Sequence, residues 1–481
     1  MFNDRLNLIM LEIQSDKKNF EKNAKYCDTV SYDKSSLGNF IYSYELLFQV
    51  AKHNRTKTAL QYIQGLLSLE KGKANMERME EEIPESEYQA YQHFITHSKW
   101  DYKGILSKVF RDTSDLMETI KTKSKKPTGL IIDESAHLKK GEKSVAVGRQ
   151  YAGVVGKVDN CQVGVYASMV NDTRAGLVNE RLFIPENWVK DKARCKLAGI
   201  PQEHIKFKTK PQLALEMVDE MVNEGVKFDW VGGDGLYGHN RELRAGLDAR
   251  GLLFILDVHK DETVFIERPH FSIPPKSGKR GRPSKKTKPD KTPLRVDKYV
   301  KQLDAGDWKI ESKIRKTHKG WKRLKVHLKK VWVFEGESDE VKERTLIITQ
   351  TMDGKKEIKY SLSNGKIEDY SHHEFAYFQS QRYWVERTFD DAKNEIGMSD
   401  YQIRKWLGWH HHHALVFMAG LYLLKQKIEH ETEAPLMSMR DARILIIVSL
   451  FGTKKDLDTR LGQMKARYEI RQKDIDRRYK T

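Results

Sequence analysis

Cysteine is scarce in this 481-residue chain, which contains only three, at positions 27, 161 and 195. An odd number at irregular spacing fits neither a disulfide framework nor a zinc site. Long apolar runs are also missing: none approaches the roughly 18 residues that a membrane-spanning helix needs, and residues 1–25 lack a signal-peptide core. We therefore expect a protein of the reducing cytoplasm that does not enter a membrane.

Acidic residues are too few to balance the basic ones. The chain has 86 Lys and Arg against 68 Asp and Glu, a formal net charge of +18. Such a charge attracts polyanions, and nucleic acid is the commonest polyanionic partner of proteins. Some basic proteins bind no DNA, so charge favours a nucleic-acid partner without identifying it.

Composition and periodicity divide the chain into five segments. Residues 1–125 carry apolar residues three and four apart, which predicts a helical N-terminal region and, from its position, a DNA-binding one. Residues 126–260 read as the first part of an α/β core and residues 261–370 as a β-rich insertion with a basic linker. Residues 371–430 supply the C-terminal helices of the core, and residues 431–481 form a helical basic end.

The core segment has a recognisable order of elements. Three strands are followed by a helix, a strand, a helix and a strand, expected at residues 129–135, 150–158, 161–170, 210–226, 228–234, 240–251 and 252–259. This is the order of the ribonuclease H-like fold, although many unrelated α/β chains could share it.

Two aspartates fall at strand ends in this scheme. Asp133 ends the first strand, and Asp234 ends the fourth within the glycine-rich GGDGLYG. In a ribonuclease H-like sheet these strands are neighbours, so the two carboxylates repel each other unless a cation such as Mg²⁺ neutralises them. Acids at strand ends also commonly cap turns, and Glu134 and Asp257 compete for the same role.

The stretch RYWVERTFDDAKNEIG, residues 382–397, offers four acids on a predicted helix. Its buried face is predicted by apolar residues at i, i+4, i+7 and i+11: Val385, Phe389, Ala392 and Ile396. An adjacent stripe carries Arg382, Glu386, Asp390 and Lys393. Asp391 and Glu395 lie off this stripe and are expected to be solvated. The alternative for the charged stripe is a ladder of surface ion pairs.

Three segments in this order resemble the DDE-type transposases of bacterial insertion sequences. They are IIDES with the following KKG and VGRQYAG, then GGDGLYG, then RYWVERTFDDAKNEIG. The third is similar to the Y-R-E-K signature of that family, whose four residues are separated by two, three and six others. Arg382, Glu386 and Lys393 match this spacing, whereas Gln379 stands at the tyrosine position.

The resemblance implies a ribonuclease H-like catalytic core with a β-rich insertion, flanked by helical N- and C-terminal regions. It implies that Asp133, Asp234 and Glu386 are catalytic and bind two Mg²⁺ or Mn²⁺ ions, and that Arg382 and Lys393 reach DNA phosphates. The expected activity is cleavage at transposon ends and strand transfer into target DNA. The expected partners are double-stranded DNA and a second copy of the chain, at the bacterial nucleoid.

The linker contains a second candidate DNA contact. In KRGRPSKK, Lys279 precedes an Arg-Gly-Arg-Pro sequence of the AT-hook form, whose two arginines are Arg280 and Arg282. Such a peptide stays narrow and places its arginines in the minor groove of A·T-rich DNA. A merely basic linker explains the segment about as well, and either would add salt-dependent affinity.

Two other interpretations belong to different classes. A domesticated DNA-binding protein would keep the fold without catalysis, against which the three acids argue. A ribonuclease H-like nuclease would cut without strand transfer, against which the insertion and the terminal helices argue. The run WHHHH at 409–413 invites a zinc site, but consecutive helical histidines point in different directions, so we reject that interpretation.

Overall fold

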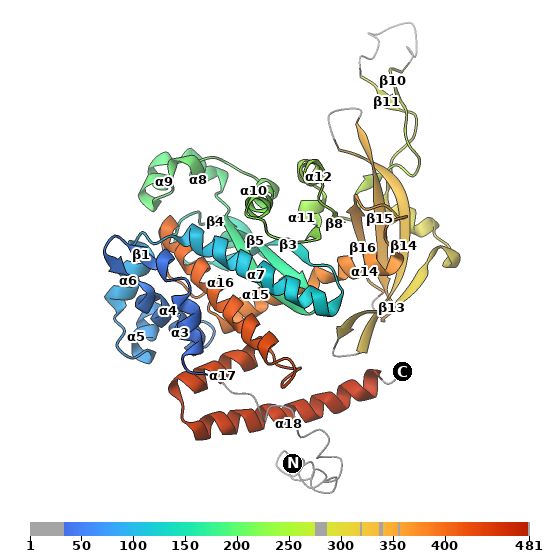
Figure 1. Ribbon diagram of the computed structural model, residues 1–481. Helices are drawn as coiled ribbons and strands as arrows, with labels where there is room; N and C mark the ends of the chain where they lie inside the picture. The colour runs from blue at the N-terminus through green and yellow to red at the C-terminus, as the bar shows by residue number, and fades with distance from the viewer. Residues whose placement is uncertain (1–32, 275–285, 318–319, 336–339, 355, 480–481) are drawn as a thin grey trace.

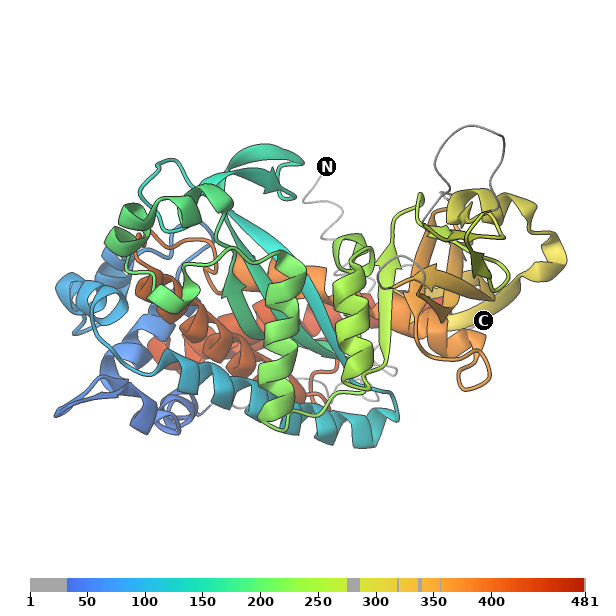
Figure 2. The ribbon, with the colours of Figure 1, turned by 90° about the horizontal axis from the view of Figure 1, so that it is seen from above.

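The computed structural model describes residues 33–274, 286–317, 320–335, 340–354 and 356–479 (Figure 1). A helical N-terminal part lies beside a mixed sheet with helices on both faces, and the sheet extends sideways into a β-rich part (Figures 1 and 2). The architecture is therefore mixed α/β, as predicted.

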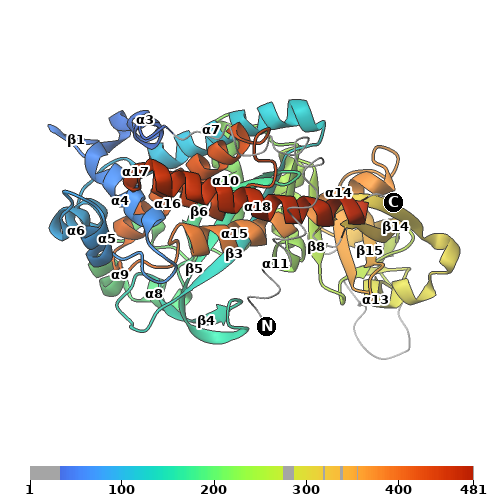
Figure 3. The same ribbon diagram turned by 90° about the horizontal axis from the view of Figure 1, so that it is seen from below.

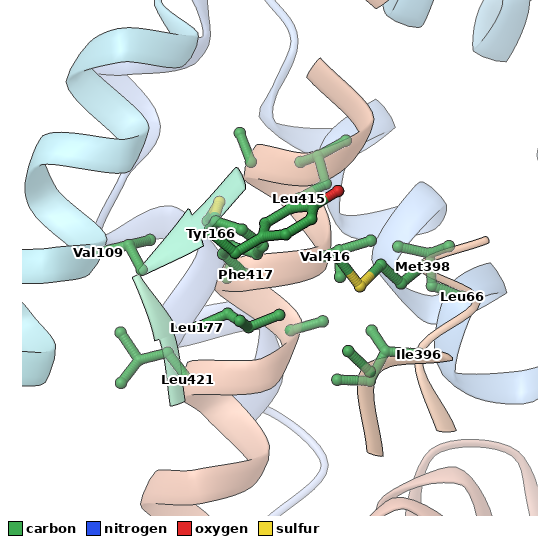
Figure 4. Packing of buried hydrophobic residues seen from close by; sticks show 14 of the residues in the cluster. Leu66, Val109, Tyr166, Leu177, Ile396, Met398, Leu415, Val416, Phe417 and Leu421 are labelled. Carbon is green, nitrogen blue, oxygen red and sulfur yellow. The ribbon is translucent and has the colours of Figure 1, made fainter. Parts of the chain in front are cut away.

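The N-terminal part is helical, which confirms the expected pattern over its described residues. Its helices are α3 (Ser36–Tyr42), α4 (Thr56–Ser68), α5 (Met76–Glu82), α6 (Tyr88–Thr96) and α7 (Tyr102–Ser124), with the short strands β1 (Gln49–Val50) and β2 (His53–Asn54). Helices α4, α6 and α7 pack against α16 (Trp406–Glu429), which is buried over most of its length. Side chains of α16 meet Leu66 of α4 and Tyr166 of the sheet in one apolar cluster (Figure 4).

Five strands form the core of the sheet in the order β6-β5-β3-β7-β8. They are β3 (Gly129–Leu138), β5 (Lys157–Asn171), β6 (Arg174–Leu182), β7 (Trp230–Gly233) and β8 (Phe254–Val258). Strands β7 and β8 run parallel to β3, and β5 runs antiparallel to it. The expected pairing of the first and fourth strands is thus confirmed.

The antiparallel strands were predicted less well. The sequence suggested strands at 150–158 and 161–170, but the first of these is split between β4 (Gly148–Ala152) and the start of β5. The strand β6 was not predicted, and it pairs with β5 on the edge that β4 also uses. Strand β5 spans fifteen residues, longer than a usual strand, so the break expected between residues 158 and 161 is absent.

Helices cover both faces of the sheet (Figure 2). On one face lie α7, α10 (Lys210–Asn223) and α12 (Arg241–Ala249), with the short α11 (Gly235–Gly238) after β7. The other face is covered by α14 (His372–Gln381), α15 (Tyr383–Glu395) and α16. Helix α10 begins where predicted because Thr209 and Gln212 form a capping box and Pro211 stands in the first turn. Helices α8 (Glu186–Lys190) and α9 (Lys192–Ala198) lie beyond β6.

The β-rich segment continues the core sheet instead of forming a separate layer. Its strands are β13 (Lys309–Thr317), β14 (Gly320–Phe334), β15 (Val341–Thr351) and β16 (Ile358–Ser363). Strand β16 pairs antiparallel with β8, and the others follow in reverse order. Smaller elements complete this part: β9 (Thr263–Val264), β10 (Phe271–Ser272), β11 (Lys288–Pro289), β12 (Leu294–Arg295) and α13 (Val296–Tyr299).

A buried ionic cluster joins the β-rich segment to helix α12. Glu335 accepts contacts from Arg244 of α12 at 2.8 Å and from Arg344 of β15 at 3.1 Å, and Arg344 also pairs with Asp248. The Arg244 and Glu335 side chains are almost completely shielded from solvent. An isolated buried charge is costly, so removing any one of these side chains would leave its partner charges unneutralised and weaken the contact.

Two helices end the chain. Helix α17 (Met439–Phe451) packs on α15 and α16, and α18 (Lys454–Tyr479) runs beneath the core to reach β14 (Figure 3). Within the part of the chain that the structure describes, every helix is too short or too polar to cross a membrane.

Candidate active site

Alternation along β3 decides which helices its two neighbouring acids meet. Ile131 packs in the apolar cluster that includes Phe389 of α15, whereas Ile132 packs with the helices of the opposite face. Since successive side chains of a strand point to opposite faces, Asp133 faces α15 and Glu134 faces α10. The contacts agree, because Asp133 meets Arg382 at the start of α15 and Lys210 of α10 pairs with Glu134 at 2.8 Å.

Three aspartates stand at one level across the parallel strands. Ile132 of β3 is paired with Gly233 of β7, and Gly233 is paired with Leu256 of β8. An aspartate directly follows each of these three residues: Asp133, Asp234 and Asp257. Asp234 and Asp257 therefore stand at the carboxyl ends of β7 and β8. Asp133 lies at the same level but in the middle of β3, which continues to Leu138, so the expectation that Asp133 ends its strand was wrong. Together they form a row of carboxylates, of which the sequence had singled out the first two.

Arg382 links these acids to the C-terminal helices. Its guanidinium donates to Asp133 Oδ2 at 3.4 Å and forms ion pairs with Asp257 at 3.1 Å and Glu386 at 2.9 Å. Arg382 lies between α14 and α15, where its side chain is 22% exposed. One cation therefore joins carboxylates from β3, β8 and α15.

Ionising all three aspartates of this row at once is unfavourable. Burial, followed by the charge of Asp234, raises the pKa of Asp133 to about 7, although Arg382 acts against this. Burial also raises the pKa of Asp234 and that of Asp257. Burial alone would lower the pKa of Arg382, but Asp257 and Glu386 raise it above its ordinary value. The site therefore has a strong affinity for positive charge.

Asp234 also performs the capping role that its position suggested. Its Oδ1 accepts from the backbone N–H of Leu236 at 2.9 Å, so it caps α11. Helix α11 lies so close to β8 that a Cβ on Gly238 would stand 1.8 Å from the carbonyl oxygen of Asp257. The glycines of GGDGLYG thus allow close backbone packing, which fixes the place of Asp234.

The competing acid Glu134 is engaged elsewhere. Besides the ion pair with Lys210, it accepts from the Tyr237 hydroxyl at 3.0 Å. Burial and then the Glu134 carboxylate raise the pKa of Tyr237, which keeps its proton on the hydroxyl. Glu134 is therefore held on the α10 side of the sheet and away from Glu386.

Helix α15 has the predicted buried face. Val385, Phe389, Ala392 and Ile396 are all buried, whereas the Glu386 side chain is 54% exposed. Lys393 lies further along α15, where burial lowers its pKa despite the charge of Asp390. Its contact with DNA, like that of Arg382, stays a prediction.

The expectation that Asp391 and Glu395 are solvated was wrong. Asp391 is paired with Arg387 at 2.8 Å and Glu395 with Arg443 of α17 at 2.9 Å, and both carboxylates are largely shielded. Helix α17 packs over this side of α15, which the local pattern could not indicate.

Gln379, at the position where the resemblance expects tyrosine, lies buried in α14. It donates to Ser361 of β16 at 2.6 Å, and Ser361 donates to Asp257 at 2.6 Å. Sequence reasoning gave Asp257 little weight and missed Ser361. The pairing of β16 with β8, which brings Ser361 opposite Asp257, had no local signal.

The remaining predicted residues lie in the linker and in α16. Lys279, Arg280 and Arg282 lie outside the described residues. The four histidines of α16 are buried and meet separate partners: Glu180 for His410, the Ile95 carbonyl for His411, Tyr62 for His412 and Tyr166 for His413.

The donors at the carboxylate row fit a hard divalent cation, because all are carboxylate oxygens. In the described residues, no three acids, histidines or cysteines converge into a ready-made metal-binding group. Arg382 instead lies between Asp133 and Glu386, where it provides positive charge.

The chain is similar to proteins of one known family. Residues 45–320, more than half of the chain, match the family model described as DDE superfamily endonuclease. A curated relative from Microchaete diplosiphon, named as a probable transposase for insertion sequence element IS701, is 26% identical over 337 residues, which cover 70% of this chain and 72% of that protein. A cryo-EM structure of piggyBac transposase, in a synaptic complex with hairpin DNA, is 11% identical with a TM-score of 0.37, covering 90% of this chain and 82% of that one.

Proposed function

Because the chain belongs to the DDE superfamily of endonucleases and is a transposase of the insertion-sequence type, we propose that Asp133, Asp234 and Glu386 bind divalent metal for cleavage and transfer of DNA strands. The observation that carries this proposal is the register of the sheet. It brings Asp133 and Asp234 to the same level on paired strands, while Arg382 joins Asp133 to Glu386.

The chemistry of the carboxylates suits this role. Bound Mg²⁺ or Mn²⁺ activates a water or a 3′-hydroxyl and stabilises the leaving oxygen in phosphodiester chemistry. Asp133 and Asp234 would hold the ions from the sheet, and Glu386 would approach from α15. The raised pKa of Asp133 supports the proposal, because burial and then the charge of Asp234 destabilise its ionised form, which a bound cation would stabilise.

We propose further that residues 126–260 and 371–430 together form a ribonuclease H-like catalytic core. The strand order β6-β5-β3-β7-β8, with the second strand antiparallel to the rest, supports this assignment. Residues 261–370 are then the insertion, and Figure 1 shows it at one end of the shared sheet. Double-stranded DNA is the proposed partner, since the net charge of +18 favours a polyanion. The active form is proposed to be a dimer on DNA.

The test uses a duplex that carries the element's own end and flank, with Mg²⁺ and a supercoiled target. Wild-type protein should cut at the end and join the 3′-hydroxyl to the target. Asp234→Ala should lose at least about 100-fold in cleavage, because losing only a partner of a metal ligand already costs about 10–100-fold. The matched control is Asp115→Asn, which changes an exposed acid on α7.

Each rival function has its own outcome in this experiment. Cleavage without joining would replace the transposase mechanism by that of a simple nuclease. Binding without cleavage by the wild type would indicate a non-catalytic DNA-binding protein. If Asp234→Ala cleaves as well as Asp115→Asn, the proposed metal site is wrong.

A further inference from the structure

A continuous set of polar contacts runs from the insertion to the candidate metal site. Thr349 of β15 donates its hydroxyl to the Gln379 side-chain oxygen, and the Gln379 amide donates to Ser361 Oγ at 2.6 Å. Ser361 then donates to Asp257 Oδ1 at 2.6 Å. The second oxygen of Asp257 is paired with Arg382 Nε at 3.1 Å.

Hydrogen bonds with matched donors and acceptors run from Thr349 to Asp257, and the last link, from Asp257 to Arg382 Nε, is an ion pair without hydrogen-bond geometry. Thr349, Ser361 and Gln379 are buried, with 3%, 0% and 6% of their surfaces exposed, so none can exchange its partner for water freely. Since a buried polar group that loses its partner is costly, the contacts favour one orientation of the Asp257 carboxylate.

Asp257 in turn orients the arginine. With Nε held at Asp257, the two terminal nitrogens of the planar guanidinium point to Asp133 at 3.4 Å and to Glu386 at 2.9 Å. A guanidinium is rigid, so fixing one edge fixes the direction of the other nitrogens. Asp257 therefore determines where the positive charge of Arg382 stands.

We infer that Asp257 is a positioning residue, which retains Arg382 so that this arginine does not displace a divalent cation from Asp133 and Glu386. The inference rests on the proposed metal site. Without the charge of Asp257, the guanidinium would be neutralised by Asp133 and Glu386 alone. It would then compete more strongly with an incoming cation for the same oxygens.

The same contacts assign a role to Gln379. It sits in the position where the Y-R-E-K pattern has a tyrosine, and its amide both accepts from Thr349 and donates to Ser361. A tyrosine hydroxyl has a single proton to donate and lies at the end of a much longer side chain. In this chain the Gln379 amide and Ser361 together orient the Asp257 carboxylate, which pairs with Arg382.

The experiment measures Mn²⁺ binding to the full-length protein without DNA, from the loss of the electron paramagnetic resonance signal of free Mn²⁺. Asp257→Asn keeps an oxygen that can accept from Ser361 but loses the charge, and should weaken Mn²⁺ binding about 10-fold. The double variant Asp257→Asn/Arg382→Gln should recover most of that affinity, because the competing cation is gone. Arg382→Gln alone should bind Mn²⁺ more tightly than the wild type.

The recovery separates positioning from structural damage, since a second substitution in a damaged site does not restore binding. Asp257→Asn with wild-type affinity, or a double variant as weak as the single one, would overturn the inference. If Asp257→Asn does not fold, Ser361→Ala replaces it: it keeps all charges and should weaken binding about threefold, and an unchanged affinity overturns the inference equally.

The proposed function fails in a different way. If wild type and Asp234→Ala bind Mn²⁺ equally, the carboxylate row is not the metal site, and both proposals fall. If Asp234→Ala loses binding while Asp257→Asn does not, only the role of Asp257 is refuted.

Discussion

Asp133 and Glu134 are neighbours on one strand, yet their carboxylates contact opposite helical layers of the protein. Asp133 accepts from Arg382 at the start of α15, and Glu134 is held by Lys210 of α10 and by Tyr237. The alternation of side chains along β3 thus decides which of two adjacent acids belongs to the candidate active site.

The two acids should therefore respond differently to loss of charge. Asp133→Asn is expected to lower DNA cleavage at least about 100-fold, since it removes a proposed metal ligand. Glu134→Gln keeps an acceptor for Tyr237 and loses only the ion pair with Lys210, so its cleavage should stay within about tenfold of the wild type. Cleavage rates of the two purified variants on one duplex provide the measurement, and equal losses would contradict the assignment.

Gly238 is expected to tolerate no side chain. A Cβ at this position would stand 1.8 Å from the Asp257 carbonyl oxygen, so Gly238→Ala must push α11 away from β8. Overpacking of this kind costs about 1–3 kcal/mol of unfolding free energy, and the displacement of Asp234 should reduce cleavage as well. Urea unfolding and cleavage assays measure the two effects. Gly153→Ala is the control, because nothing lies within 4 Å of its added Cβ.

Glu335 is expected to be essential for the attachment of the insertion. Glu335→Ala leaves Arg244 and Arg344 without the carboxylate that they share, and breaking a buried ion pair costs about 3–5 kcal/mol. Urea titration should show this loss of unfolding free energy. Glu85→Ala removes an exposed pair with Lys57 and should change stability by about 1 kcal/mol at most. Similar effects of the two variants would contradict this account.

The histidines of α16 should make the fold sensitive to acid. Burial lowers the pKa of His411 and that of His412 to about 3, and the pKa of His413 is also well below its ordinary value. An unfolded histidine titrates near 6.5, so between about pH 6.5 and 3 the unfolded state binds more protons than the folded one. Stability is therefore complete above about pH 6.5 and falls as the pH is lowered. Each of these histidines lowers the free energy of unfolding by up to about 1.4 kcal/mol for each pH unit of acidification in this range.

Urea unfolding at a series of pH values measures this slope. His411→Phe keeps a ring against Trp100 but cannot take up a proton, so its stability should decline less steeply below pH 6.5. His53→Gln changes an exposed histidine and should leave the slope unchanged. An equal slope in all three proteins would show that the buried ring is not the source of the acid sensitivity.

Some elements were predictable because their signals are local. The strand at Asp133, the capped helix α10 and the glycine-rich turn at Asp234 each follow from short patterns in the chain. Strand β6 was missed because its residues alternate too weakly to indicate a strand, and it forms by pairing with β5. Glu395 was misjudged since Arg443, its partner, is 48 residues away.

The sequence by itself determined that Asp133 and Asp234 belong to neighbouring strand segments and that Glu386 lies beside the buried face of its helix. It wrongly placed Asp133 at the end of its strand, because β3 continues to Leu138. Periodicity and turn chemistry act over a few residues, so they can predict such local features. Only the tertiary structure decided that Asp257 joins the row and that Arg382 stands among the carboxylates. It also decided that Gln379 and Ser361 anchor that arginine. The place of Asp257 in the row depends on the pairing of β7 with β8. The contact of Ser361 with Asp257 depends on the pairing of β8 with β16, whose paired residues lie about a hundred positions apart, and no local pattern specifies which residues meet there.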